Sequence, residues 1–388
     1  MTSISQKETY NLLSQMIRIN SENPMLVTGS QGEGELARFM GKYMENMGLE
    51  VSYQDLGNNR VNAIGVLKGS GGGKTIMLNG HLDTVGIEGM TIDPLEPTLK
   101  DGKVFGRGSQ DMKGGVAAMV MAVKSLVDAG IKLNGDVIIT CVADEEYGSI
   151  GTEEIVKEYT ADGGIVTEPT DEQIVIAHKG FVWSKITVEG KAAHGSRYED
   201  GVDAIVKMGK VLAGLDELEN QILVKKQHPL LGRGSVHASM IQGGSELSVY
   251  PSFCQLELER RILPGENLET SQKEIAEILE RISHNDPAFK ASFETWFERV
   301  PLEVDPNEAI VKSISSSYQQ MNQQTPQYQG VSFWTDAAIL AQAGIPTVIF
   351  GPKGKGLHAA VEYVELSSVV NTAEVIARTI MDFCAVSD

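Results

Sequence analysis

Four short apolar runs in this sequence each lead to an acidic residue or a histidine, and this pattern strongly constrains the fold. The runs cover residues 75–78, 137–142, 165–166 and 346–350, and they lead to His81, Glu145, Glu168 and His358. Between the first two runs, residues 114–129 are rich in Ala, Val and Met, which is typical of a buried helix. Apolar strands that alternate with helices predict an α/β domain with a mostly parallel sheet flanked by helices. Ligands bind outside the carboxyl ends of such strands, so we expect the polar residues to share one crevice.

The middle of the chain has a different texture. Residues 181–188 and 254–262 alternate apolar and polar side chains, and helical stretches lie at residues 201–219 and 268–284. This pattern predicts a small α+β domain whose antiparallel sheet is half exposed. A chain of 388 residues is also long enough for two domains. We therefore predict a discontinuous α/β domain of residues 1–177 and 298–388, with an α+β domain inserted at residues 178–297.

Composition excludes some classes of function. The formal net charge of −19 argues against binding to nucleic acid, although acidic surfaces are also common for solubility alone. No apolar run approaches the ~18 residues of a membrane span, and the first residues do not resemble a secretory signal. Three cysteines without metal-type spacing favour a cytoplasmic protein with reduced thiols.

The polar residues after the first strands allow structural and functional interpretations. His81 and Asp83 are two residues apart at a strand end, so both side chains can point to one side, and the carboxylate can orient a histidine ligand. A structural histidine is the alternative. Asp111 lies just before the apolar helix in a glycine-rich stretch, where it can be an N-cap or a metal ligand.

The acidic run Asp144-Glu145-Glu146 follows a strand of Val and Ile. Like charges at a buried strand end repel one another, and a bound cation removes that cost; a solvated loop is the alternative. Across the whole chain, two histidines and three carboxylates are available to hold two divalent cations, which leaves Asp83 and Glu145 for proton transfer. This combination predicts a metal-dependent hydrolase.

Five motifs carry a resemblance to a known family. They are Gly80-His81-Leu82-Asp83-Thr84-Val85, Gly106-Arg107-Gly108 through Asp111-Met112-Lys113-Gly114-Gly115, Asp144-Glu145-Glu146, Thr167-Glu168-Pro169 and Gly356-Leu357-His358. In this order they resemble the co-catalytic zinc amidohydrolases and exopeptidases, which include acetylornithine deacetylase, succinyl-diaminopimelate desuccinylase, aminoacylase and glutamate carboxypeptidase. The resemblance covers almost the whole chain.

The resemblance implies a role for each residue of the centre. Asp111 would bridge two metal ions, His81 and Glu168 would complete one site, and Glu146 and His358 the other; Asp83 would orient His81, and Glu145 would be the general acid/base. Zinc is the metal that the family implies, and His and carboxylate ligands also suit cobalt or manganese.

The resemblance also assigns residues in the inserted domain, which would be the family's lid and dimerisation domain. His194, in Ala192-Ala193-His194-Gly195-Ser196, would reach into the active site of a partner subunit, and Arg261 would bind a substrate carboxylate. A polar loop histidine and a surface salt-bridge arginine are the alternatives. Ser248 departs from the family pattern, because many relatives have an asparagine there.

The expected function is removal of an acyl group from a small N-acyl amino acid, as in acetylornithine deacetylase, by a homodimer using metal-activated water. A metallo-exopeptidase acting on dipeptides or on C-terminal residues is the alternative within the same chemistry. A binding protein that keeps the fold without catalysis is the alternative from another class.

Overall fold

The structure is a computed structural model that describes residues 4–387, and the chain divides into two compact units. The first contains the described residues up to Ile176, Val304–Gln329 and the chain from Thr335 onward; the second contains Ala177–Glu303 and Gly330–Trp334. The second unit extends beyond the predicted end at residue 297 because its last long strand continues to Arg299, which pairs with Phe181. Trp334 also packs edge-on against Phe181, with 6.4 Å between ring centroids.

A large sheet forms the centre of the first unit. From one edge, its neighbouring strands are in order β1 (Glu50–Asp55), β2 (Val61–Leu67), β6 (Val137–Val142), β3 (Ile76–His81), β7 (Gly163–Val166) and β15 (Thr347–Ile349). The four strands from β6 to β15 are parallel, whereas β2 pairs antiparallel with both of its neighbours, β1 and β6. Every residue of β3, β6 and β7 is buried, as expected for strands covered on both faces. β8 (Ile174–His178) continues the sheet and leads into the second unit.

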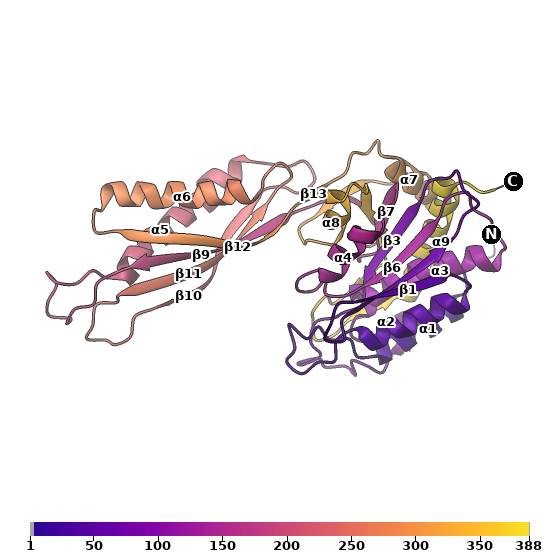
Figure 1. The fold of residues 1–388 in the computed structure, drawn as a ribbon, viewed down its shortest axis with the longest axis horizontal. Coiled ribbons are helices and arrows are strands. Elements are labelled where there is room, and N and C mark those ends of the chain that lie inside the picture. Colours follow the sequence, from indigo (N-terminus) through magenta and orange to yellow (C-terminus); the bar gives the residue numbers. More distant parts are fainter. Residues whose placement is uncertain (1–3, 388) are drawn as a thin grey trace. The chain divides into compact units, whose positions relative to one another are not determined.

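Helices flank this sheet (Figure 1). They are α1 (Gln6–Arg18), α2 (Gly34–Asn46), α3 (Gly114–Asp128), α4 (Ile150–Glu158), α7 (Ala309–Asn322), α8 (Ala337–Gln342) and α9 (Leu366–Cys384). α3 is buried over Gly114–Val123 and packs against α1, α9 and the central strands, which makes it the buried helix that the sequence predicts. The mixed α/β architecture confirms the predicted fold class.

A second, four-stranded antiparallel sheet lies in the same unit and was not anticipated from the sequence. Its order is β16 (Gly354–Lys355), β17 (Tyr363–Glu365), β5 (Lys103–Phe105) and β4 (Thr98–Lys100). These strands are only two or three residues long, which is too short to produce a periodic pattern. The sheet nevertheless joins two segments that are more than two hundred residues apart in the chain.

The second unit is an antiparallel sheet packed against two helices. The strand order is β10 (Ser235–Gly243), β11 (Phe253–Ile262), β9 (Gly180–Glu189) and β12 (Lys290–Arg299), and the helices are α5 (Ala204–Glu217) and α6 (Leu268–Asn285). Buried residues alternate along β9 and β11, and these residues form a core with the inner faces of the helices. Within residues 4–387, no helix combines the length and the apolar character that crossing a membrane requires.

Candidate metal centre

Three adjacent parallel strands bring candidate ligands to the same edge of the central sheet. His81 is the last residue of β3, Glu145 and Glu146 follow β6, and Glu168 is the second residue after β7. The central strand of the three is β3, so its terminal histidine lies between the two acidic segments.

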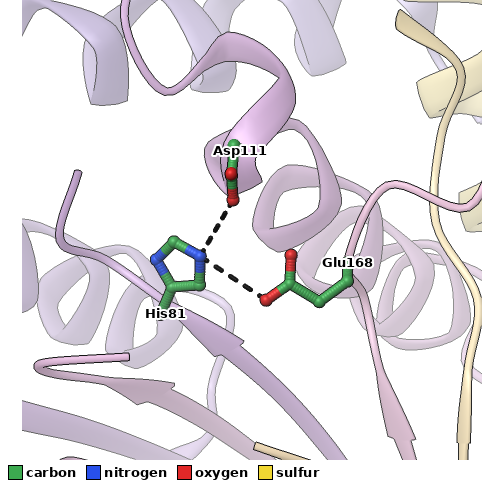
Figure 2. A group of neighbouring side chains, drawn as sticks. All are labelled: His81, Asp111 and Glu168. Atoms are coloured by element: carbon green, nitrogen blue, oxygen red, sulfur yellow. Dashed lines mark hydrogen bonds and ion pairs between the residues drawn. The ribbon is translucent and has the colours of Figure 1, made fainter. Parts of the chain in front are cut away.

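The first group of ligand atoms surrounds Nε2 of His81. This nitrogen lies 3.1 Å from Oδ1 of Asp111 and 3.5 Å from Oε1 of Glu168. Figure 2 shows the three side chains pointing toward one another. The side chains of His81 and Glu168 are almost fully buried. These three residues converge closely enough to hold one metal ion.

The second group surrounds Nε2 of His358. This nitrogen lies 3.3 Å from Oδ2 of Asp111 and 3.0 Å from Oε2 of Glu146. Asp111 therefore belongs to both groups and directs one carboxylate oxygen to each. The alternative role of Asp111 as an N-cap is wrong, because α3 begins after Lys113 and has no side-chain cap.

Electrostatics also favour a bound cation. Burial raises the pKa of Glu168 well above its ordinary value. For Asp111 burial acts in the same direction, but hydrogen bonds from His358 and His81 outweigh it and lower the pKa. Oε1 of Glu146 is buried and has no hydrogen-bond partner among residues 4–387. Two imidazoles and three carboxylates, one of which has an unpaired oxygen, are a donor set suited to divalent metal ions.

Glu145 lies beside the ligands without belonging to either group. Its Oε2 atom is 3.9 Å from Nε2 of His81, which is longer than the contacts of Asp111 and Glu168 to that nitrogen. Burial raises the pKa of Glu145 well above its usual range, and the negative charge of Glu168 raises it further. A carboxylate with a raised pKa can accept and return a proton near neutral pH.

Asp83 contacts His81 in a different way from the one expected. Nδ1 of His81 is 2.9 Å from the backbone carbonyl oxygen of Asp83, whereas the nearest Asp83 carboxylate oxygen is 3.6 Å away. The Asp83 carboxylate instead accepts hydrogen bonds from the backbone N–H groups of Glu145, at 3.1 Å, and Glu146, at 3.2 Å. Asp83 thus fixes the segment after β6 as well as the ring of His81.

A buried polar network behind Asp83 was missed by sequence reasoning. Asn23 donates to the carboxylates of Asp83, at 2.7 Å, and Asp144, at 2.9 Å. Arg60 donates to the same oxygen of Asp144 at 2.7 Å and to Glu33 at 2.7 Å. All five side chains are buried. Asn23 and Arg60 are isolated polar residues, and no local pattern marks them.

The two candidate residues of the inserted domain, His194 and Arg261, lie in the second unit. His194 is exposed, and its Nδ1 atom is 2.8 Å from the Ser196 hydroxyl oxygen. Arg261 forms an ion pair with Glu259 at 2.6 Å, and its guanidinium lies over the ring of Phe181. This ion pair supports the interpretation of Arg261 as a salt-bridge partner, and its role in substrate binding stays a prediction. The Ser248 backbone carbonyl accepts a hydrogen bond from the N–H of Gly195, so this residue adjoins the His194 loop.

Comparison of the sequence with known proteins assigns the chain to a family. A model of peptidase family M20/M25/M40 matches residues 77–382. An N-formyl-4-amino-5-aminomethyl-2-methylpyrimidine deformylase from Bacillus subtilis is 30% identical over 374 residues, which cover 88% of each chain. An acetylornithine deacetylase from Myxococcus xanthus is 29% identical over 339 residues, covering 85% of this chain and 86% of the relative.

The fold of this chain is also similar to that of a solved structure. The aminopeptidase PepT from Bacillus cereus superimposes with a TM-score of 0.83 at 22% identity, covering 98% of this chain and 99% of that chain. The predicted family resemblance is confirmed by these matches. The chain belongs to peptidase family M20/M25/M40 and is a hydrolase of that family.

Proposed function

We propose that this chain is a di-metal amidohydrolase that removes a small acyl group from an N-acyl amino acid, in the manner of acetylornithine deacetylase. The observation that carries the proposal is the position of Asp111, whose two carboxylate oxygens face two separate groups of ligands. A single carboxylate shared in this way suits two neighbouring ions.

His81 and Glu168 would hold one ion, Glu146 and His358 would hold the other, and Asp111 would bind both. When bound, such ions lower the pKa of water toward ~7 and polarise an amide carbonyl. Zinc is the expected metal, and cobalt and manganese are the alternatives, because imidazole and carboxylate ligands suit all three.

Glu145 would act as the general acid/base. Its carboxylate lies at the edge of the ligand groups and does not belong to either, so it is available to take a proton from the attacking water and return it to the leaving nitrogen. Asp83 would support this role by holding the backbone N–H of Glu145.

The lid residues would act in a homodimer. His194 would donate a hydrogen bond to the developing oxyanion in the partner subunit, and Arg261 would bind the substrate carboxylate in a forked contact. A surface suited to dimerisation is the edge strand β10, where the side chains of Met240 and Ile241 are 63% and 54% exposed. An exposed apolar edge strand can pair with the same strand of a second chain.

A substrate panel tests the reaction type. The purified chain, supplied with Zn²⁺, Co²⁺ or Mn²⁺ in separate assays, would be incubated with N-formyl, N-acetyl and N-succinyl amino acids, with a formylated aminopyrimidine and with di- and tripeptides. Faster hydrolysis of N-acyl amino acids supports the proposal. Preference for peptides would replace it with a metallo-exopeptidase, and no hydrolysis of any amide would leave only a binding role.

Two neighbouring substitutions separate proton transfer from metal binding. Glu145→Gln is expected to keep two ions per chain and to lose nearly all turnover, whereas Glu146→Gln is expected to lose metal as well. Metal analysis and kcat of both variants provide the measurement. Retained turnover in Glu145→Gln would remove this residue from the proton role.

The cytoplasmic location stays a prediction, supported by three buried free cysteines.

A further inference from the structure

Glu362 is a fully buried acid that accepts hydrogen bonds from four N–H groups around the Asp111 segment. Its Oε1 atom accepts from the backbone N–H groups of Gln110, at 2.9 Å, and Asp111, at 3.0 Å. Its Oε2 atom accepts from the backbone N–H of Gly108, at 3.0 Å, and from Nη1 of Arg107, at 2.8 Å. One carboxylate therefore orders the backbone of nearly the whole segment that presents Asp111.

The small antiparallel sheet explains why Glu362 reaches this segment. Tyr363, the first residue of β17, pairs with Phe105, the last residue of β5. Glu362 comes just before this pair and Gly106 just after it, and the N–H of Gly106 donates to the Glu362 carbonyl at 3.2 Å. The register thus places the Glu362 side chain directly beside residues 107–111.

Arg107 extends the same connection to the His358 loop. Its Nη2 atom donates to the backbone carbonyls of Ala359, at 3.3 Å, and Gly86, at 3.0 Å. Ala359 follows His358, whose φ of 57° lies in the left-handed region that non-glycine residues rarely adopt. The Arg107–Glu362 ion pair therefore joins the backbone that carries Asp111 to the backbone that carries His358.

We propose that Glu362 and Arg107 are positioning residues that hold Asp111 and His358 at the spacing needed to bind two metal ions. The inference rests on the proposed metal centre. Because Asp111 belongs to both ligand groups, loss of Glu362 is expected to weaken the binding of both ions. Loss of His358 itself would weaken mainly the group that contains it.

A neutral isostere tests this role. In Glu362→Gln, the NH₂ end of the amide faces N–H donors that it cannot accept from, so two of the four hydrogen bonds are lost. Outer partners of metal ligands typically change metal affinity by about 10- to 100-fold. We expect a loss of this size for both ions.

The chain offers a matched control in the second unit. Glu266 accepts hydrogen bonds from the buried Arg260, at 3.2 Å, and from the backbone N–H of Leu263, at 3.0 Å, which are the same kinds of partner as those of Glu362, and it also accepts from Lys226 at 3.1 Å. Glu266→Gln removes a comparable arginine–carboxylate contact and leaves both ligand segments intact. Its metal affinity is expected to equal that of the unmodified chain.

The measurement is competition between the full-length Zn²⁺-loaded protein and a chromophoric chelator, together with the absorption spectrum after replacement by Co²⁺. Glu362→Gln is expected to release both ions at lower chelator concentration and to change the Co²⁺ spectrum. Should this variant fail to fold, Arg107→Lys provides the same test, because a compact ammonium does not span the three partners that different nitrogens of the guanidinium reach.

Three results would overturn the inference in distinguishable ways. Unchanged affinity and an unchanged Co²⁺ spectrum in a folded Glu362→Gln variant would show that the pair does not position the ligands. An equal loss of affinity in Glu266→Gln would show a general effect of lower stability. If the unmodified chain bound no metal, the proposed centre would fail, and the positioning role with it.

Discussion

The carboxylate of Asp83 accepts a hydrogen bond from the backbone N–H of Glu145 at 3.1 Å. Asp83 follows β3, and Glu145 follows the neighbouring strand β6, so the contact joins two strand ends of the central sheet. The same carboxylate accepts from the N–H of Glu146, and the backbone carbonyl of Asp83 contacts His81. A single residue therefore couples a candidate ligand of each metal group to the candidate general base.

Asp83→Asn should reduce both catalysis and metal binding. The amide nitrogen of asparagine would face N–H donors, so the segment of Glu145 and Glu146 would lose an acceptor. We expect kcat and metal affinity to fall about 10- to 100-fold. Steady-state kinetics and chelator competition provide the measurement.

A matched control for this substitution lies before β6. Asp136 accepts hydrogen bonds from the backbone N–H of Gly69, at 2.8 Å, and from Lys68, at 2.9 Å, and contacts no candidate ligand. Asp136→Asn should leave kcat and metal affinity unchanged. Equal values for Asp83→Asn and the unmodified chain would show that the two strand ends are positioned without this contact.

Gly115 allows α3 to approach the ligand-bearing end of β7. A Cβ atom at this position would lie 1.9 Å from the backbone carbonyl oxygen of Thr167, the residue before Glu168. Gly115→Ala should therefore destabilise the fold by ~1–3 kcal/mol, because a packed backbone must move. Chemical denaturation followed by fluorescence and circular dichroism provides the measurement.

Gly209, within α5, is the matched control for Gly115. A Cβ atom there meets nothing within 4 Å, so Gly209→Ala should stabilise its helix by ~0.5–1 kcal/mol. Both changes replace a helical glycine by alanine, and the expected effects have opposite signs. A stability loss of the same size in both variants would contradict the steric explanation for Gly115.

Residues that follow a long apolar strand were predictable as one site. His81 ends a strand that is buried along its whole length, Glu145 and Glu168 follow two others, and parallel strands present their carboxyl ends at one edge. Apolar periodicity also predicted the buried helix α3 and the alternating strands of the second unit. The fold class and the neighbourhood of these three residues follow from such regular signals.

Residues held by long-range polar contacts were not predictable. Asn23 meets Asp144 across 121 positions of sequence, and Glu362 reaches the Asp111 segment from strands of two or three residues. Burial of such groups depends on partners that only the folded chain supplies. For the same reason, the expected contact between His81 and the Asp83 carboxylate was replaced by a contact to the Asp83 backbone.

Asp286 should make the stability of the second unit depend on pH in the acidic range. Hydrogen bonds from Lys207 and Lys210 lower the pKa of Asp286 from 3.8 to about 2, and these contacts join the end of α6 to α5. The unfolded chain binds the proton at higher pH than the folded chain does. The stabilisation is therefore complete above about pH 4, and it is lost as the pH falls through about 2.

Thermal melting of Asp286→Asn against the unmodified chain tests this expectation. The difference in Tm should be largest above about pH 4, should disappear near pH 2 and should shrink with added salt. Asp216→Asn is the control, because Asp216 accepts from the neutral side chain of Asn220 at 2.8 Å. A Tm difference that stays constant from pH 2 to pH 6 would show that the lysine contacts do not act through the charge of Asp286.

His194 provides a test of whether two chains build one active site. His194 is exposed and belongs to neither ligand group, and the family resemblance assigns it to the active site of a partner subunit. His194→Ala and Glu145→Gln should each be nearly inactive. Mixed and allowed to exchange subunits, they should recover up to about a quarter of full activity, because half of the dimers are mixed and each has one intact site.

Subunit exchange must be verified independently, with two differently tagged variants captured together from the mixture. A matched mixture of His194→Ala with His228→Ala controls for the loss of a histidine, since His228 pairs with Glu303 at 2.9 Å in the second unit. That mixture should be more active than the mixture of His194→Ala with Glu145→Gln, because dimers of His228→Ala alone keep two intact active sites. Verified exchange without recovery in the His194→Ala and Glu145→Gln mixture would place His194 outside catalysis in a partner subunit.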